Sequence, residues 1–111
     1  MSGGSNDTQK IREIDVNDAF QRISKGNAVL IDVREDDELA AAKVPGALHI
    51  PLRELSQRAQ ELPPGKELLL FCRSGNRSMF ATELLVRNGE SPVYNVAGGI
   101  IAWYRAGLPL A

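Results

Sequence analysis

The chain has 111 residues, of which 43% are hydrophobic and 24% are charged, and this composition fits one globular domain and excludes a disordered or fibrous protein. Thirteen basic residues stand against fourteen acidic ones, and the formal net charge of -1 gives no overall field that would attract nucleic acid or an anionic membrane. The single cysteine, Cys72, excludes an intramolecular disulfide bond and fits a reducing compartment.

The first residues of the chain, 1–10, are mostly small and polar, and we expect them to form a flexible tail before one domain over residues 11–111. They lack the basic and apolar regions of a signal peptide, and no apolar run approaches the ~20 residues that span a bilayer. We therefore expect a cytoplasmic protein with no membrane partner. The sequence also points to no metal and no cofactor.

The first half of the domain alternates between extended and helical patterns. A short extended segment over residues 11–14 leads to Asp15, which can cap a helix whose apolar residues recur at three- and four-residue steps until Gly26 ends it. Residues 28–33 form a continuous apolar run, typical of a strand covered on both faces. The acidic and alanine-rich residues 35–42 predict a short helix.

The second half continues the alternation. Residues 47–50 are a short strand candidate, and leucines and alanine at three- and four-residue steps predict an amphipathic helix over residues 52–62, before the Pro63-Pro64-Gly65 cluster. Residues 67–71 form the most apolar strand. A patterned helix over residues 77–88 and a strand over residues 93–96 follow.

The glycines of residues 97–99 turn the chain into a final short helix that contains Trp103. Alternating strands and helices predict right-handed crossovers, and hence an α/β fold with a mainly parallel sheet and helices on both faces. In such sheets ligands bind outside the carboxyl ends of the strands. This rule directs attention to the segment that follows residues 67–71.

That segment is a polar loop between the most apolar strand and a well-patterned helix. It consists of Cys72, Arg73, Ser74, Gly75, Asn76, Arg77 and Ser78. The three central residues tolerate tight or left-handed backbone, so consecutive amides can turn inward and form a concave anion-binding nest. Those amides, the helix dipole and the two arginines all favour the thiolate, which is the reactive form of cysteine.

Taken alone, Cys72 is better interpreted as a small buried apolar residue, which is what a cysteine at a strand end most often is. The surrounding loop favours a reactive cysteine instead. The only histidine, His49, follows a different strand and is better interpreted as a structural residue, so a Cys-His dyad is not expected. Activation of the cysteine would then rest on the electrostatics of the loop.

Three separated motifs resemble the rhodanese family, and the match extends from about Ile11 to the end of the chain. They are IDVRE at residues 31–35 with VPGALHIP at 44–51, CRSGNRS at 72–78, and VAGGIIAWYRAGLPL at 96–110. The resemblance implies a rhodanese-like fold with five mainly parallel strands flanked by helices. It also implies a thiosulfate sulfurtransferase that carries sulfane sulfur as a cysteine persulfide.

The resemblance also assigns roles to individual residues. Cys72 would attack the outer sulfur of thiosulfate, sulfite would leave, and the bound sulfur would pass to cyanide, a small thiol or a protein acceptor. Arg77 would neutralise the sulfonate charge of the donor. Asp32 and Arg34 would brace the loop, and Trp103 would be a packing residue. The residues expected to bind the substrate are Arg73, Ser74, Gly75, Asn76 and Ser78.

Two other functions stay open. Phosphatases and arsenate reductases occur on the same fold, but they resemble a C-x5-R pattern, whereas Cys72 to Arg77 is C-x4-R and no convincing general acid is present. The shorter loop favours a sulfur atom over a phosphoryl group. The chain could also be a sulfur-carrier or interaction module for a partner enzyme, and fold alone does not discriminate this role.

Overall fold

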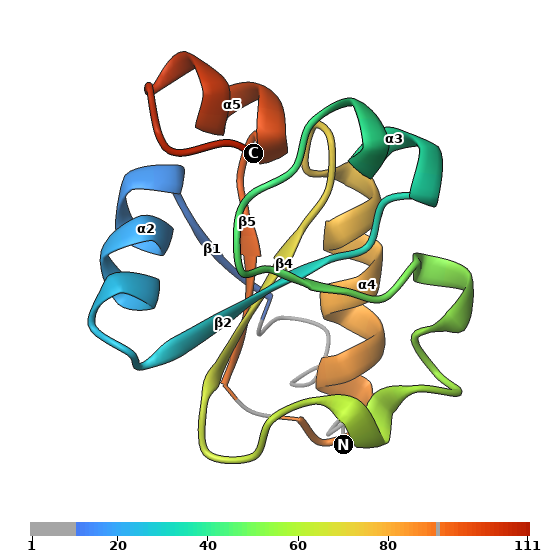
Figure 1. Cartoon of the computed structure of the whole chain (residues 1–111). Helices are drawn as coiled ribbons and strands as arrows, with labels where there is room; N and C mark the ends of the chain where they lie inside the picture. The colour runs from blue at the N-terminus through green and yellow to red at the C-terminus, as the bar shows by residue number, and fades with distance from the viewer. Residues whose placement is uncertain (1–10, 91) are drawn as a thin grey trace.

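The computed structural model describes residues 11–90 and 92–111, so the predicted flexible tail over residues 1–10 lies outside the described residues. Five strands form one sheet in the order β1-β5-β4-β2-β3, and every pairing is parallel (Figure 1). The predicted α/β class is therefore confirmed. The strands are β1 (Arg12–Ile14), β2 (Ala28–Asp32), β3 (Leu48–His49), β4 (Glu67–Phe71) and β5 (Val93–Val96).

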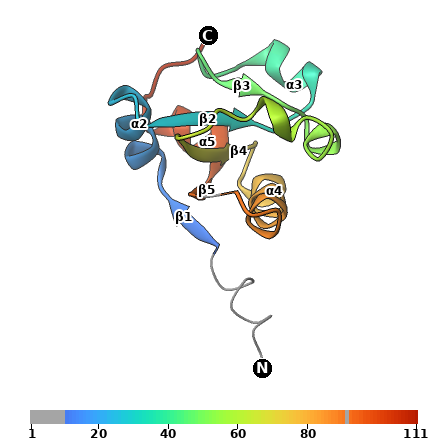
Figure 2. The same cartoon turned by 90° about the horizontal axis from the view of Figure 1, so that it is seen from below.

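Helices cover both faces of the sheet, as Figure 2 shows with α2 and α4 on opposite sides. The α-helices are α2 (Val16–Ser24), α3 (Asp36–Ala41), α4 (Asn76–Arg87) and α5 (Gly99–Arg105). The central strand β4 alternates its side chains between two apolar cores: Leu68 and Leu70 pack toward α4, and Leu69 and Phe71 pack toward α2 and α5. Burial on both faces explains why β4 has no polar side.

One predicted element is wrong. Residues 52–62 do not form an amphipathic helix but two 3-10 turns, η1 (Leu52–Glu54) and η2 (Ala59–Glu61). The backbone of Arg58, at φ -111° and ψ 16°, interrupts the helical path between them. Both Leu55 and Leu62 still reach the core beside α4, so packing against the sheet overrides the local periodicity. The other elements lie within one residue of their predicted ends.

The topology brings the carboxyl ends of β2, β4 and β5 to one edge of the sheet, where α3, α4 and α5 begin (Figure 1). Strand β4 is in the middle of the sheet, so the residue after it stands at the centre of this edge. Among residues 11–90 and 92–111, no helix has the length and apolar character needed to cross a membrane.

Candidate active site

Cys72 directly follows β4, and its position is fixed by contact with the start of α5. The amide of Ile100 donates to the carbonyl of Cys72 at 2.9 Å, and the amide of Ile101 donates to the carbonyl of Arg73 at 3.2 Å. This close approach requires Gly99, because a Cβ at that position would lie 2.3 Å from the Cys72 carbonyl oxygen. The first turn of α5 therefore fixes the backbone of Cys72 and Arg73 through hydrogen bonds.

The loop after Cys72 turns its polar groups onto the sulfur. The amides of Gly75 and Ser78 donate to Sγ at 3.1 and 3.3 Å, and the Ser78 hydroxyl oxygen lies 3.3 Å from the same atom. Gly75 has φ 106°, a left-handed conformation that side chains rarely adopt, and it directs its amide inward. The amides of Gly75 and Ser78 and the Ser78 hydroxyl thus surround the sulfur at the beginning of α4, and we call these groups the cradle.

The Cys72 side chain is buried, with 1% of its surface exposed, and burial has the largest single effect on its ionisation. Burial raises the pKa of the Cys72 thiol, but the Ser78 hydroxyl and the amides of Ser78, Gly75 and Ser74 lower it. The hydrogen bonds together outweigh burial, so the pKa lies below its ordinary value. The cradle therefore favours the thiolate.

A polar network extends the cradle to β5 and to the edge strand β1. The Ser78 hydroxyl donates to Oδ1 of Asn95 at 2.5 Å, and the Asn95 amide nitrogen donates to Glu13 at 2.8 Å and to the Gly75 carbonyl at 3.3 Å. Asn95 is fully buried in β5. Asn95 was not among the site residues predicted from the sequence, although a lone asparagine inside an apolar strand is a usable signal.

Arg77, which the family resemblance predicts to neutralise the charge of the donor, forms an ion pair. Its guanidinium donates to both carboxylate oxygens of Glu38 in α3, at 2.6 and 2.7 Å. The Arg77 hydrogen bond lowers the pKa of Glu38 to about 2, so this carboxylate is charged at neutral pH. Glu38 thus compensates part of the positive charge at the mouth of the cradle, and it was not among the site residues predicted from the sequence.

Asp32 and Arg34 are both buried and pair with each other. The Arg34 guanidinium donates to Asp32 Oδ2 at 2.9 Å and to the Ala42 carbonyl at 2.9 Å, and the Arg34 backbone amide donates to Asp32 Oδ1 at 3.0 Å. These bonds hold the end of α3 rather than the cysteine loop. Their bracing reaches the loop only indirectly, because α3 carries Glu38, the partner of Arg77.

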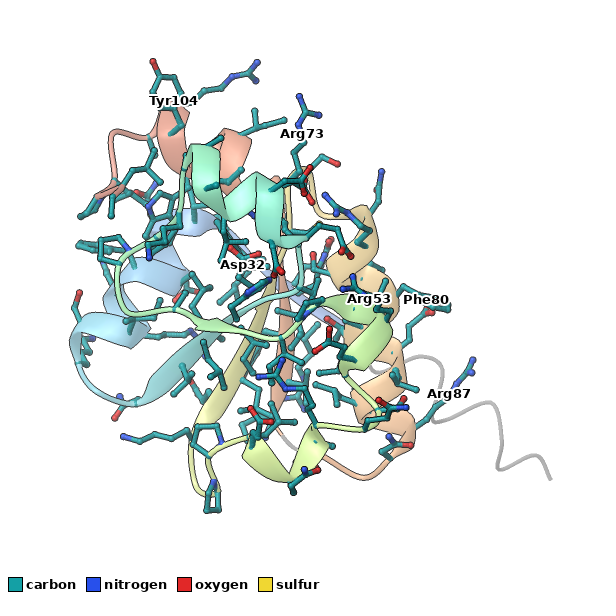
Figure 3. The ribbon with its side chains drawn as sticks, turned by 45° about the vertical axis from the view of Figure 1, so that its right-hand side comes forward. Asp32, Arg53, Arg73, Phe80, Arg87 and Tyr104 are labelled. Carbon is teal, nitrogen blue, oxygen red and sulfur yellow. The ribbon has the colours of Figure 1, made fainter. Side chains whose placement is uncertain are left out.

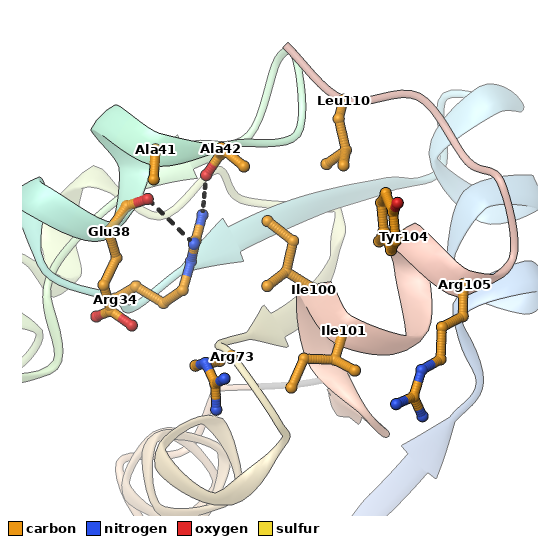
Figure 4. Close-up of a pocket in the computed structure, with 10 residues that line it drawn as sticks. All are labelled: Arg34, Glu38, Ala41, Ala42, Arg73, Ile100, Ile101, Tyr104, Arg105 and Leu110. Atoms are coloured by element: carbon orange, nitrogen blue, oxygen red, sulfur yellow. Dashed lines mark hydrogen bonds between the residues drawn. The ribbon is translucent and has the colours of Figure 1, made fainter.

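The remaining loop residues, Arg73, Ser74 and Asn76, are exposed around the cradle, and Figure 3 places Arg73 at the surface near the carboxyl edge of the sheet. Arg73 lines a groove of about 560 Å³ between α3 and α5 (Figure 4). Nε2 of His49 lies 2.7 Å from the carbonyl oxygen of Arg34, and this contact connects β3 to the segment that follows β2. No cluster of metal-binding side chains occurs among the residues that the structure describes.

Comparison with known proteins identifies the family. The family model described as the rhodanese-like domain matches residues 15–106 of this chain. This chain belongs to the rhodanese-like family of sulfurtransferases. It is similar to a sulfurtransferase of Allochromatium vinosum, with 39% identity over 90% of this chain and 94% of that protein.

Two solved structures support the rhodanese-like fold. A rhodanese-related protein of Thermoplasma volcanium matches 90% of this chain and 97% of its own, with a TM-score of 0.83 and 32% identity. A thiosulfate sulfurtransferase of Pseudomonas aeruginosa matches 94% of this chain with a TM-score of 0.84 and 27% identity, although the match covers only 21% of that longer protein.

Proposed function

We propose that this rhodanese-like protein takes a sulfane sulfur atom from thiosulfate or a similar donor and passes it to cyanide or a thiol through a persulfide on Cys72. The observation that carries the proposal is the pair of amides, from Gly75 and Ser78, that donate to Sγ. They stabilise negative charge on a sulfur that, among residues 11–90 and 92–111, is hydrogen-bonded to no basic side chain that could activate it.

The proposed reaction has two displacement steps. The Cys72 thiolate attacks the outer sulfur of thiosulfate, a new S–S bond forms, and the old S–S bond breaks as sulfite leaves with its electron pair. An acceptor nucleophile, from cyanide, a small thiol or a partner protein, then attacks the outer sulfur and the Cys72 thiolate leaves. No net oxidation of the protein occurs, and no cofactor is needed.

Other groups around the cradle would bind the transferred sulfur and the charge of the donor. Backbone amides of the loop from Arg73 to Ser78 would surround the outer sulfur of the persulfide. Arg77 supplies positive charge at the mouth, and its ion pair with Glu38 limits how strongly that charge attracts a doubly charged donor.

Phosphatase chemistry fits this site poorly. An alkoxide leaving group needs a general acid near the cysteine. The carboxyl group of Glu38 pairs with Arg77 of the loop and is a candidate acid, but its pKa of about 2 leaves it without a proton at neutral pH. Transfer of sulfur requires no such acid, because sulfite leaves as a weak base.

The experiment that tests this function measures sulfur on the protein. Incubation with thiosulfate should add the mass of one sulfur atom to the intact chain, and cyanide should remove it as thiocyanate. Cys72→Ser should abolish both changes, and Arg87→Ala, at an exposed position in the last turn of α4, should retain them. An adduct of unchanged yield in the serine variant would refute the assignment.

A further inference from the structure

The groove beside the cysteine loop is too large for a small inorganic anion. It has a volume of about 560 Å³ and lies between α3 and α5, and one of its lining residues is Arg73, which directly follows Cys72 in the chain (Figure 4). Pockets of about 300 to 1,000 Å³ are the size that encloses organic ligands. Neither thiosulfate nor cyanide would fill it.

The charged side chains of the groove leave two cations without a partner. Arg34 is paired with Asp32, and Glu38 is paired with Arg77. Within residues 11–90 and 92–111, the guanidinium groups of Arg73 and Arg105 have no carboxylate at ion-pair distance. Each alone would be an ordinary solvated charge, but both line one groove next to a nucleophile.

Between these cations the wall of the groove is apolar. In the view of Figure 4, Ile101 lies between Arg73 and Arg105, and Ile100, Tyr104 and Leu110 continue the wall toward α3. Tyr104 is 71% exposed, which is unusual for an aromatic side chain. A ligand complementary to this wall has carbon atoms as well as negative charge.

From these features we propose that the groove binds the organic part of a thiol or persulfide substrate that carries carboxylates. Arg73 and Arg105 bind the carboxylates, and Ile101 and Tyr104 pack against the carbon chain. The inference rests on the proposed function and names the class of substrate that reaches Cys72. An organic persulfide would give its outer sulfur to the Cys72 thiolate as its S–S bond breaks, and the organic thiolate would leave.

The first test compares two thiols as acceptors from the Cys72 persulfide. Glutathione carries two carboxylates, and 2-mercaptoethanol carries none. We expect Arg105→Ala to raise the KM for glutathione about tenfold, Arg105→Glu to raise it further, and both to leave the KM for 2-mercaptoethanol within twofold of wild type. Arg87→Ala is the control, because it removes a surface arginine at the far end of α4 (Figure 3). Equal shifts for both thiols, or none, would overturn the proposal.

A second test does not depend on sulfur transfer. S-methylglutathione, which cannot accept sulfur, is titrated calorimetrically into the wild-type chain and into Arg105→Glu. Binding to the wild type that weakens about tenfold in the variant supports the groove, even if thiosulfate fails to load Cys72 and the proposed function falls. If S-methylglutathione does not bind to the wild type, the groove proposal is wrong, even if thiosulfate loads Cys72 with sulfur. A protein acceptor is then the alternative occupant of the groove.

Discussion

The hydroxyl of Ser78 has one proton and two neighbours that can accept it. In the structure it donates to Asn95 at 2.5 Å, while the Cys72 sulfur lies 3.3 Å away. This arrangement suits the neutral thiol, which can donate its own proton to the Ser78 oxygen. When the cysteine ionises, rotation of the hydroxyl toward Sγ would add a hydrogen bond to those that the loop amides already donate to the thiolate.

We expect Ser78→Ala to raise the pKa of Cys72, because the variant removes a hydrogen bond to the thiolate while burial still opposes ionisation. A higher pKa means less thiolate at neutral pH. Alkylation by iodoacetamide should slow several-fold at pH 7 and recover at alkaline pH. Ser74→Ala is the matched control, since only its backbone amide acts on the sulfur. An unchanged pH profile in Ser78→Ala would remove the hydroxyl from this role.

At the level of single residues, the sequence could identify Cys72 and its loop because contiguous residues form the cradle. The asparagine inside an apolar strand singles out Asn95 as a buried polar residue, but neither Asn95 nor Glu38 could be assigned to the cysteine loop, because both come from other segments of the chain. The pairing of Arg77 with Glu38 depends on where α3 packs. Local pattern carries no information about that placement.

At the level of elements, α3 and α4 are joined by the ion pair between Glu38 and Arg77. The pKa of Glu38 falls from 4.5 to about 2 in the folded protein, so its stabilisation is complete above pH 4.5 and is lost as the pH falls toward 2. Because both side chains are partly exposed, at 36% and 26%, solvent screening limits the gain to about 1–2 kcal/mol.

We therefore expect Glu38→Gln to lower the free energy of unfolding by about 1–2 kcal/mol at neutral pH and by almost nothing near pH 2. Urea unfolding curves of both proteins across this range measure the difference. A gap between the two proteins that stays constant with pH would show that the ionised carboxylate is not the source of the stability.

The contact between α5 and the cysteine loop depends on Gly99. Its φ is 54°, and an added Cβ would meet the Cys72 and Arg73 carbonyl oxygens at 2.3 and 2.5 Å. We expect Gly99→Ala to destabilise the fold by about 3 kcal/mol or more in urea unfolding and to abolish persulfide formation.

Gly107 provides the control for that substitution, because its φ of 73° is also left-handed but nothing lies within 4 Å of an added Cβ. Gly107→Ala should cost only the backbone strain, about 1 kcal/mol, and leave the cradle intact. Equal costs at the two glycines would mean that close approach to the loop is unimportant.

Element boundaries were predictable where the apolar pattern of the sequence matches the burial of the element. Strand β4 and helix α4 follow from an apolar run and a clear helical pattern. Residues 52–62 share the helical spacing, yet η1 and η2 form because the chain must deliver two leucines to the core across a bend at Arg58. Spacing alone does not distinguish the two outcomes.

At the scale of the whole molecule, Trp103 joins α5 to the rest of one apolar core. Its ring meets Phe20 and Phe71 edge to face, with centroids 5.9 and 5.7 Å apart, and its Nε1 donates to the Pro109 carbonyl at 2.7 Å. The packing role that the resemblance implied for this residue has a physical basis in these contacts, which span α2, β4 and the segment after α5.

We expect Trp103→Ala to lower the free energy of unfolding by about 3–5 kcal/mol, through lost burial and the cavity left behind. Tyr104→Ala, one residue later and 71% exposed, should change it by no more than about 0.5 kcal/mol. Urea unfolding followed by circular dichroism measures both, and a small effect at Trp103 would contradict its place in the core.

In the proposed persulfide, burial of the Cys72 sulfur would restrict which bond an incoming thiol can break. Only 1% of Cys72 is exposed, so the loop would shield the inner sulfur of a persulfide, and the outer sulfur, held by the loop amides, would lie nearer the opening of the cradle. A thiol that attacked the inner atom would become disulfide-linked to the protein and block it. We therefore expect an incoming thiol to attack the outer atom, which would return Cys72 to its thiolate form.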